Sequence, residues 1–405
     1  MQTASLHKGG GIGFEPPLVA HIIFRLATGG LENGLVNLIN ATPPTRYRHA
    51  IICLTDATEF QEQITRNGVE VIALGKRPGH DFGAYWRAWK ALRALKPSIV
   101  HTRNFPTMEY LMVAVCAGVP GRIHGEHGRD MYDLDGSNKV YNAFRRLMRP
   151  LIDRYIAVSE DLAAWLRTTI DVEPARITQI YNGVDSTRFF PADGSRVPIG
   201  PRGFAEPNSV IVGTIGRMQT VKNQTLLARA FIRLVEQEPS LRKSVRLVMV
   251  GDGPLRHEAA EMLRQAGLET LAWLPGERQD TAALLRQMDV FVLPSIAEGI
   301  SNTILEAMAT GLPVVATNVG GNCEIVQEAE TGALVVPNDV DALANGIRTY
   351  VLNRSLRERH GMAARTRIES EHTMEVMVGK YMAVYDSIIA ATGSRRMRAY
   401  QPAVG

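Results

Sequence analysis

The sequence predicts an α/β fold with two domains, each built on a doubly wound parallel sheet, that face each other across a cleft. Three observations lead to this prediction. Short apolar runs alternate with helical patterns along most of the chain, which is typical of parallel strands covered by helices on both faces. The alternation stops once, in the proline- and glycine-rich segment 186–209, and then resumes. At 405 residues the chain also exceeds one ordinary core.

The first half of the chain carries six apolar runs that we interpret as strands. They are LVAHIIF (18–24), HAIICL, VEVIAL, SIVHT, GRIHGEH and YIAVS. Helical patterns follow them, including those near 107–117, 138–151 and 159–168. We therefore predict a flexible lead over 1–16, an N-terminal domain over 17–187 and a hinge over 188–208.

The second half repeats the alternation. Its strand-like runs are VIVGTIG, VRLVMV, LAWLP, DVFVLP, PVVAT and ALVVP, and its clearest helical patterns cover 223–237, 254–266 and 302–310. An apolar helix over 372–392 has no strand after it, so we expect it to cross back onto the N-terminal domain. We therefore predict a C-terminal domain over 209–371, this crossing helix, and a disordered tail over 393–405.

The composition is that of an ordinary soluble globular protein, with 45% hydrophobic and 21% charged residues. A net charge of +4 permits contact with anionic lipid or phosphorylated ligands and does not call for nucleic acid. Three scattered cysteines suggest a reducing compartment and no disulfide framework. The first residues lack the apolar run of a secretory signal, and no apolar stretch could span a bilayer. We expect a cytoplasmic protein.

Two cations follow the first strand of the second domain. The segment GRMQTVKN places Arg217 and Lys222 at a strand exit. A guanidinium can bind phosphate through two hydrogen bonds, and an ammonium nearby adds a second charge, so the pair suits a diphosphate. Taken alone, two solvated loop charges explain the segment about as well.

The segment EGISNTILEA (298–307) combines an anion site with two carboxylates. Ser301 or Asn302 is a good N-cap, so a helix should begin near residue 302 and present free amides to a phosphate. Glu298 and Glu306 are eight positions apart and fall on roughly one side. Carboxylates repel phosphate, so we expect them to face hydroxyl groups. A sugar nucleotide supplies both groups, whereas a surface glutamate and a helix-dipole partner are the plainer explanation.

Glycines at three further strand exits are weaker signals. Gly29 and Gly30 follow the first strand, Gly253 lies in GDGPL, and Leu274 precedes a glycine in LAWLPG. Each could let main chain approach a ligand, and each is also explained by a plain turn. The strand exits carry neither a dinucleotide fingerprint nor a phosphate-binding GxxxxGK[ST] loop, which disfavours a dehydrogenase and a P-loop hydrolase.

The strand exit at 122–135 is rich in potential metal ligands. They are His124, Glu126, His127, Asp130, Asp133 and Asp135. The H-x-x-H spacing puts the two histidine rings on opposite faces of a strand, so we do not expect a metal site. One histidine beside a reacting centre or a substrate hydroxyl fits better.

Residues 138–154 mix arginines and a lysine with Tyr141, Phe144, Leu147 and Met148. Such a helix could lie on an anionic membrane surface. A domain helix with a solvated basic face is the more ordinary explanation.

At this point the sequence resembles the retaining glycosyltransferases of family 4, which have the GT-B fold of two Rossmann-like domains. The second half carries the resemblance in GRMQTVKN, GDGPL, LPG and EGISNTILEAMATGLPVVATNVGG, and the first half in TGGLENGLVNLI, IVHTRN, HGEHG, YIAVSEDLA and IYNGVD. It covers about residues 18–390. The segments GGLENG and HGEHGRD look like sugar transferases of bacterial exopolysaccharide clusters, including those associated with PEP-CTERM protein sorting.

The resemblance implies a role for each matching side chain. Arg217 and Lys222 would hold the donor diphosphate and stabilise it as the leaving group. Glu298 would contact the transferred sugar and Glu306 the nucleotide ribose. His127 would sit by the sugar ring, although the neighbouring His124 could take that place.

The resemblance also implies main-chain contacts to the donor. Gly29 and Gly30 would close over the phosphates, and the turn of Ser301, Asn302 and Thr303 would help bind the sugar. The base would be met around Gly253 and Leu274. Tyr181 stands where a proline is common in the family, and we expect no functional consequence.

The implied reaction transfers a sugar from a UDP-, GDP- or ADP-linked donor to a saccharide or lipid-linked saccharide, without a metal or other cofactor. The departing phosphate would accept the acceptor's proton, and Glu298 as a covalent nucleophile ranks below this route. The N-terminal domain would hold the acceptor, and the membrane contact would be peripheral, at the inner face.

Two other functions remain open at this stage. One is a sugar-nucleotide 2-epimerase, which has a similar two-domain fold and should carry further acid–base residues at the cleft. The other is a non-catalytic protein that binds sugar nucleotides. Release of nucleoside diphosphate only when an acceptor is supplied would separate a transferase from both.

Overall fold

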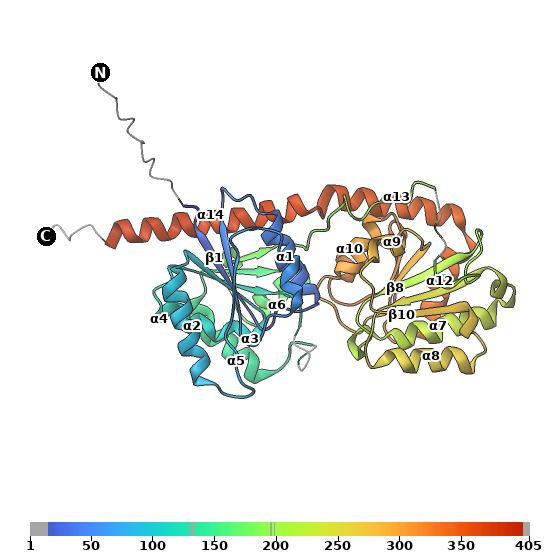
Figure 1. Cartoon of the computed structure of the whole chain (residues 1–405), viewed down its shortest axis with the longest axis horizontal. Helices are drawn as coiled ribbons and strands as arrows, with labels where there is room; N and C mark the ends of the chain where they lie inside the picture. The colour runs from blue at the N-terminus through green and yellow to red at the C-terminus, as the bar shows by residue number, and fades with distance from the viewer. Residues whose placement is uncertain (1–14, 130–132, 134, 195–196, 198, 400–405) are drawn as a thin grey trace, which may run out of the picture.

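The computed structural model describes residues 15–129, 133, 135–194, 197 and 199–399, which form two α/β domains side by side (Figure 1). Each domain has one sheet, and every strand pairing in both sheets is parallel. The predicted fold class is confirmed. The predicted lead falls largely on residues 1–14, which lie outside the described residues.

The N-terminal sheet has seven strands in the order β3-β2-β1-β4-β5-β6-β7. They are β1 (Leu18–Ile23), β2 (Arg48–Cys53), β3 (Glu70–Ala73), β4 (Ile99–Arg103), β5 (Gly121–Glu126), β6 (Arg154–Ala157) and β7 (Ile177–Gln179). The helices are α1 (Gly30–Ala41), α2 (Phe82–Leu95), α3 (Phe105–Met108), α4 (Tyr110–Cys116), α5 (Lys139–Met148) and α6 (Glu160–Thr168). The strand order reverses between β1 and β4, where open α/β sheets bind ligands.

The C-terminal sheet has six strands in the order β10-β9-β8-β11-β12-β13. They are β8 (Val210–Ile215), β9 (Val245–Val250), β10 (Ala272–Gly276), β11 (Val290–Leu293), β12 (Val314–Thr317) and β13 (Gly332–Val335). The helices are α7 (Gln224–Gln237), α8 (Leu255–Gln265), α9 (Thr281–Leu285), α10 (Asn302–Ala309), α11 (Asn322–Ile325), α12 (Val340–Leu352) and α13 (Arg354–Glu371). Here the order reverses between β8 and β11, which brings the loops after these strands together.

The last helix, α14 (Met374–Ala399), returns to the N-terminal domain (Figure 1). Its buried side chains join the core beneath the first sheet, among them Met377, Tyr381 and Tyr385. The hydroxyl of Tyr47 donates to the carboxylate of Asp386 at 2.6 Å, which fixes the helix from outside the core. The prediction of a disordered tail over 393–405 is wrong for 393–399, which continue α14, while 400–405 lie outside the described residues.

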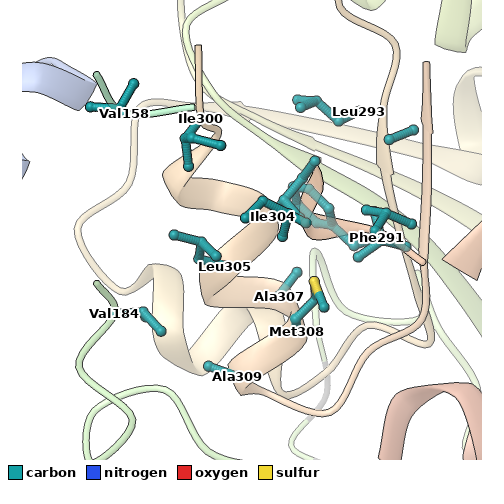
Figure 2. Packing of buried hydrophobic residues seen from close by; sticks show 14 of the residues in the cluster. Val158, Val184, Phe291, Leu293, Ile300, Ile304, Leu305, Ala307, Met308 and Ala309 are labelled. Carbon is teal, nitrogen blue, oxygen red and sulfur yellow. The ribbon is translucent and has the colours of Figure 1, made fainter. Parts of the chain in front are cut away.

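The two domains also touch through a shared apolar cluster at α10. Ile300, Leu305 and Ala309 belong to the same buried cluster as Val158 and Val184 of the N-terminal half. Figure 2 shows Val158 next to the start of α10 and Val184 near its end. This packing fixes the helix that the sequence places at the centre of the site.

Polar contacts between the domains add to this packing. The carboxylate of Glu324 accepts hydrogen bonds from the main-chain amides of Glu160 (2.7 Å) and Asp161 (2.9 Å), at the start of α6. A carboxylate is a favourable partner for these free amides and for the helix dipole. The hydroxyl of Tyr181 bonds to the same carboxylate, so this residue takes part in the domain contact.

No helix in the described part of the chain is both long enough and apolar enough to cross a membrane.

Replacing Tyr385 with alanine should strongly destabilise the N-terminal domain. The side chain is fully buried, and its ring packs edge-on against Tyr47 with ring centroids 5.3 Å apart. Removing a buried aromatic side chain costs about 3–5 kcal/mol. Urea unfolding measures the change, with Ser387→Ala on the exposed side of α14 as a control expected within about 0.5 kcal/mol of the native protein. Equal stability of the two variants would show that α14 does not complete this core.

Candidate functional site

The 298–303 loop follows β11 and includes the first two residues of α10, at the end of the C-terminal sheet that faces the other domain. The hydroxyl of Ser301 accepts a hydrogen bond from the amide of Ile304 and caps α10. The prediction that this helix begins near residue 302 is therefore confirmed. The Ser301 and Thr303 hydroxyls lie 3.1 Å apart, so the turn presents hydroxyl groups beside the free amides of the helix end.

Glycines allow this loop to be packed against main chain on two sides. A Cβ at Gly320 would overlap the carbonyl of Glu298, and a Cβ at Gly321 would overlap the carbonyl of Gly299. On the other side, a Cβ at Gly299 would lie 2.6 Å from the carbonyl oxygen of His127 in the N-terminal domain. The loop is thus held between its own domain and the end of β5.

Lys222 and Glu298 form an ion pair, which the sequence interpretation did not foresee. The Lys222 ammonium lies 2.5 Å from a carboxylate oxygen of Glu298, and the hydroxyl of Ser295 donates to the same oxygen at 2.6 Å. The sequence had assigned the two side chains to different parts of a ligand. A diphosphate arriving at the α10 terminus would compete with Glu298 for the ammonium and free the carboxylate for a hydroxyl partner.

Arg217 is exposed after β8 and faces the first turn of α1. Burial raises the pKa of the Glu32 carboxyl in that turn, and the charge of Arg217 partly offsets the rise. The Glu32 carboxylate folds back over Gly29, where a Cβ would overlap it. The structure therefore brings Gly29 and Arg217 to one place and adds Glu32, which sequence reasoning missed although the GGLE segment was singled out.

Asn302 links the two domains directly. Its amide nitrogen donates to the carbonyl of Gly30 at 3.0 Å, and its amide oxygen accepts from the side chain of Asn182 at 2.7 Å. The predicted glycine pair and the predicted helix terminus therefore meet. Asn182 belongs to the IYNGVD segment, whose role at the site could not be read without the fold.

Glu306 lies in the second turn of α10 and is partly buried. Burial raises the pKa of its carboxyl to about 7, and the charge of Arg188 in the hinge segment opposes the rise. A neutral carboxyl at moderate pH can both donate a hydrogen bond to a hydroxyl group of a ligand and accept one from it.

The predicted base contacts lie at a sheet edge. Side chains at Gly251 and Gly253 would overlap the carbonyls of Gly216 and Met218, and both glycines have positive φ. The glycines therefore support the loop that carries Arg217. Leu274 lies in the edge strand β10.

The two candidate histidines have different surroundings. His124 is fully buried, with Nδ1 2.8 Å from the hydroxyl of Thr102 and Nε2 3.4 Å from the carboxylate of Glu126. His127 lies three residues further on, just past the end of β5 and against the 298–303 loop, and its buried Nε2 has no partner among the described residues. Burial and the charge of Arg103 lower the pKa of His127 well below its usual value, so its ring is neutral near pH 7.

No set of three histidine, cysteine or acidic side chains among the described residues is placed to hold a metal ion. Glu126 instead pairs with Arg145, 3.0 Å away, and this interaction lowers the pKa of Glu126 to about 2 against the effect of burial. Asp130 of the predicted acidic segment lies outside the described residues.

A small pocket adjoins the end of β5. Two arginines, two carboxylates and an aromatic ring make it a polar pocket with one flat apolar wall. Its lining residues are Glu126, Gly128, Arg129, Asp133, Gly136, Arg145, Leu162 and Trp165.

Glu306→Gln should stabilise the protein at pH 8 and not at pH 5. The folded-state pKa of Glu306, about 7, exceeds its ordinary value of 4.5. The fold therefore favours the neutral carboxyl, and this contribution to stability is lost as the pH rises from about 4.5 through 7. Removing the charge should add up to about 3 kcal/mol to the free energy of unfolding at pH 8.

Urea unfolding at both pH values checks this expectation. Glu261→Gln on α8 is the control, because Arg264 lowers the pKa of Glu261 to about 2 and its exposed carboxylate gains nothing from neutralisation. An equal gain for Glu306→Gln at pH 5 and pH 8 would contradict burial as the cause.

Comparisons with known proteins support the resemblance seen in the sequence. A model described as Glycosyltransferase Family 4 matches residues 28–188, and a model described as Glycosyl transferases group 1 matches residues 209–353. The solved structure of Anabaena Alr3699/HepE in complex with UDP and glucose superposes with a TM-score of 0.76 at 18% identity, covering 92% of this chain and all of that one.

Two curated relatives align over most of the chain. The Escherichia coli UDP-Gal:alpha-D-GlcNAc-diphosphoundecaprenol alpha-1,3-galactosyltransferase is 30% identical over 351 residues, which is 81% of this chain and 86% of that protein. The putative glycosyltransferase EpsF of Bacillus subtilis is 28% identical over 310 residues, or 73% and 78% of the two chains. The chain therefore belongs to glycosyltransferase family 4 and is a glycosyltransferase of the GT-B fold.

Proposed function

We propose that this glycosyltransferase moves a sugar from UDP to a hydroxyl of a saccharide or lipid-linked saccharide, with retention of configuration and without a metal. The observation that carries the proposal is the ion pair of Lys222 with Glu298 at the N-terminus of α10. This arrangement offers a cation to phosphate and a carboxylate to a sugar within one loop. The names of the Escherichia coli relative and the Anabaena complex support uracil as the base.

In the proposed site, the donor lies across the ends of β8 and β11. Arg217, Lys222 and the amides of the 301–303 turn bind the diphosphate, as does the loop at Gly29 and Gly30. Glu306 accepts hydrogen bonds from the ribose. The base lies near Gly253 and Leu274.

The sugar meets both domains. Glu298 binds its hydroxyl groups, and neutral His127 lies beside its ring. Bond breaking between the anomeric carbon and the phosphate oxygen leaves the negative charge on UDP, which Arg217 and Lys222 stabilise. The acceptor oxygen bonds to the same face of the anomeric carbon, and its proton passes to the departing phosphate. Two side-chain cations and a helix terminus then supply the stabilisation that a metal would otherwise give.

The acceptor side is proposed to be the polar pocket beside His127. Arg129 lies at this pocket with its guanidinium group over the ring of Trp165 and 3.0 Å from the carboxylate of Asp161, and a phosphate of the acceptor would compete with Asp161 for this cation. The named acceptor of the Escherichia coli relative is a lipid-linked sugar diphosphate, and EpsF is a further relative. We place the reaction in exopolysaccharide or cell-envelope glycan synthesis, on the cytoplasmic side of the membrane.

A nucleotide panel tests the donor site. UDP at one hundred times its dissociation constant should add about 2.7 kcal/mol to the stability of the native protein, with smaller effects from GDP and ADP. Thermal shift should show the effect unchanged by EDTA and lost in Glu306→Ala. Glu261→Ala on the exposed side of α8 should keep it. Loss of the shift on adding EDTA would overturn the metal-free proposal, and absence of any nucleotide effect would overturn the donor site.

The exposed face of α5 should bind anionic membranes. Val140 (74% exposed), Ala143 and Leu147 (72% exposed) fall on one side of the helix, with Lys139 beside them. Within residues 138–154, Arg145 is occupied inside the domain, so the contact rests chiefly on this apolar stripe.

Co-sedimentation with vesicles tests the membrane contact. Binding to vesicles containing phosphatidylglycerol should exceed binding to phosphatidylcholine and fall several-fold in a Val140→Asp, Leu147→Asp double variant. The exposed Val197→Asp in the hinge segment serves as the control. Equal binding by both variants would exclude α5 as the contact.

A further inference from the structure

Asn104 has an unusual main-chain conformation at the end of β4. Its φ is 59° and its ψ is 166°. Residues with a side chain rarely adopt this combination, which is essentially reserved for glycine. A residue keeps such a conformation only when its surroundings impose it, so the contacts of Asn104 indicate what the strain achieves.

Those contacts converge on the end of β5. The Asn104 amide donates to the carbonyl of Gly125 at 2.8 Å, and its side-chain oxygen accepts from the main-chain amide of His127 at 2.7 Å. The turn is also held by the hydroxyl of Thr107, which donates a hydrogen bond to the carbonyl of Arg103 at 2.8 Å. The side chain of Asn104 therefore holds the main chain of His127 in place.

The position of the His127 ring depends on this hydrogen bond. A Cβ at Gly125 would lie 2.8 Å from Nε2 of His127 and 3.1 Å from Nε2 of His101. Both ring nitrogens are buried and have no hydrogen-bond partner among the described residues. Because Nε2 is not held by a partner, the place of the ring is set by the main chain to which Asn104 bonds.

The same main chain meets the other domain. The carbonyl of His127 faces Gly299 so closely that a Cβ there would lie 2.6 Å away. Gly299 is next to Glu298, which pairs with Lys222. A shift at Asn104 would thus be passed to the loop that carries the proposed sugar contact.

We propose that Asn104 is a positioning residue for sugar transfer, whose strained turn sets His127 against the 298–303 loop. The inference rests on the proposed function, in which His127 and Glu298 flank the transferred sugar. A purely structural asparagine in this conformation could be replaced by glycine with no loss of activity. A positioning residue could not, so activity should fall in Asn104→Gly.

Asn104→Gly and Asn104→Asp test the inference. Glycine relieves the strain and removes the bond to His127, whereas aspartate keeps an acceptor oxygen in the same place. Lys96→Gly is the matched control, because Lys96 also has positive φ (48°) but caps α2 far from the site. Both glycine variants should therefore fold with an unchanged or higher melting temperature.

The variants should differ in the rate of the catalysed reaction. With UDP-glucose or UDP-galactose as donor and water as acceptor, the kcat of UDP release should fall about tenfold to a hundredfold in Asn104→Gly, with KM changed less than about twofold. Asn104→Asp should stay within about threefold of the native protein, and Lys96→Gly should be unchanged. Native kcat in Asn104→Gly would overturn the inference.

Hydrogen exchange separates this inference from the donor assignment. The His127 amide should exchange at least about tenfold faster in Asn104→Gly than in the native protein or Asn104→Asp. UDP should still shift the melting temperature of all variants, because Arg217, Lys222 and Glu306 of the other domain supply most of its proposed side-chain contacts. If UDP fails to bind the native protein, the donor assignment fails. In that case the exchange rate of the His127 amide and the NMR signals of the His127 ring test the positioning role of Asn104. Values in Asn104→Gly unchanged from the native protein would overturn that role.

Discussion

The site depends on main chain packed against main chain. Gly320 and Gly321 let their segment approach the carbonyls of Glu298 and Gly299, and Gly299 in turn lets the end of β5 approach the loop. A Cβ at Gly320 or Gly321 would displace the 298–303 loop within its own domain, and a Cβ at Gly299 would push that loop away from the end of β5. The ionic and hydrogen-bonding groups of the site can meet only because these three residues have no side chain.

Charges within the site are arranged in opposing pairs from different strands and domains. Lys222 neutralises Glu298, and Arg217 acts on Glu32 across the cleft. In the proposed binding mode, a diphosphate with a sugar replaces both carboxylates as a partner for the cations, so that binding is an exchange of ion pairs. Glu306 stands apart, since burial disfavours its charge and stability is given up to place a carboxylate there.

Hydrophobic periodicity and turn chemistry were enough to predict the two parallel sheets apart from β7, and the start of α10. Buried parallel strands give continuous apolar runs, so their pattern survives in a single sequence. Contacts between residues far apart in the chain leave no such pattern in the sequence. The bond from Asn182 to Asn302 joins residues 120 positions apart, and the strain at Asn104 is a property of dihedral angles that its neighbours impose. The prediction of a disordered tail was wrong over 393–399 for a simpler reason. These polar residues extend a helix that had already begun.

Several polar contacts between the domains share one chemical feature. On the N-terminal side they use main-chain atoms, namely the carbonyls of Gly30 and His127 and the amides of Glu160 and Asp161, whereas Asn182 contributes its side chain. Such atoms are identical in every sequence of the same fold. Surface side chains of the N-terminal half that lie outside the domain contacts can therefore change while these main-chain contacts stay in place. The same domain contact is thus compatible with different side chains around the proposed acceptor pocket.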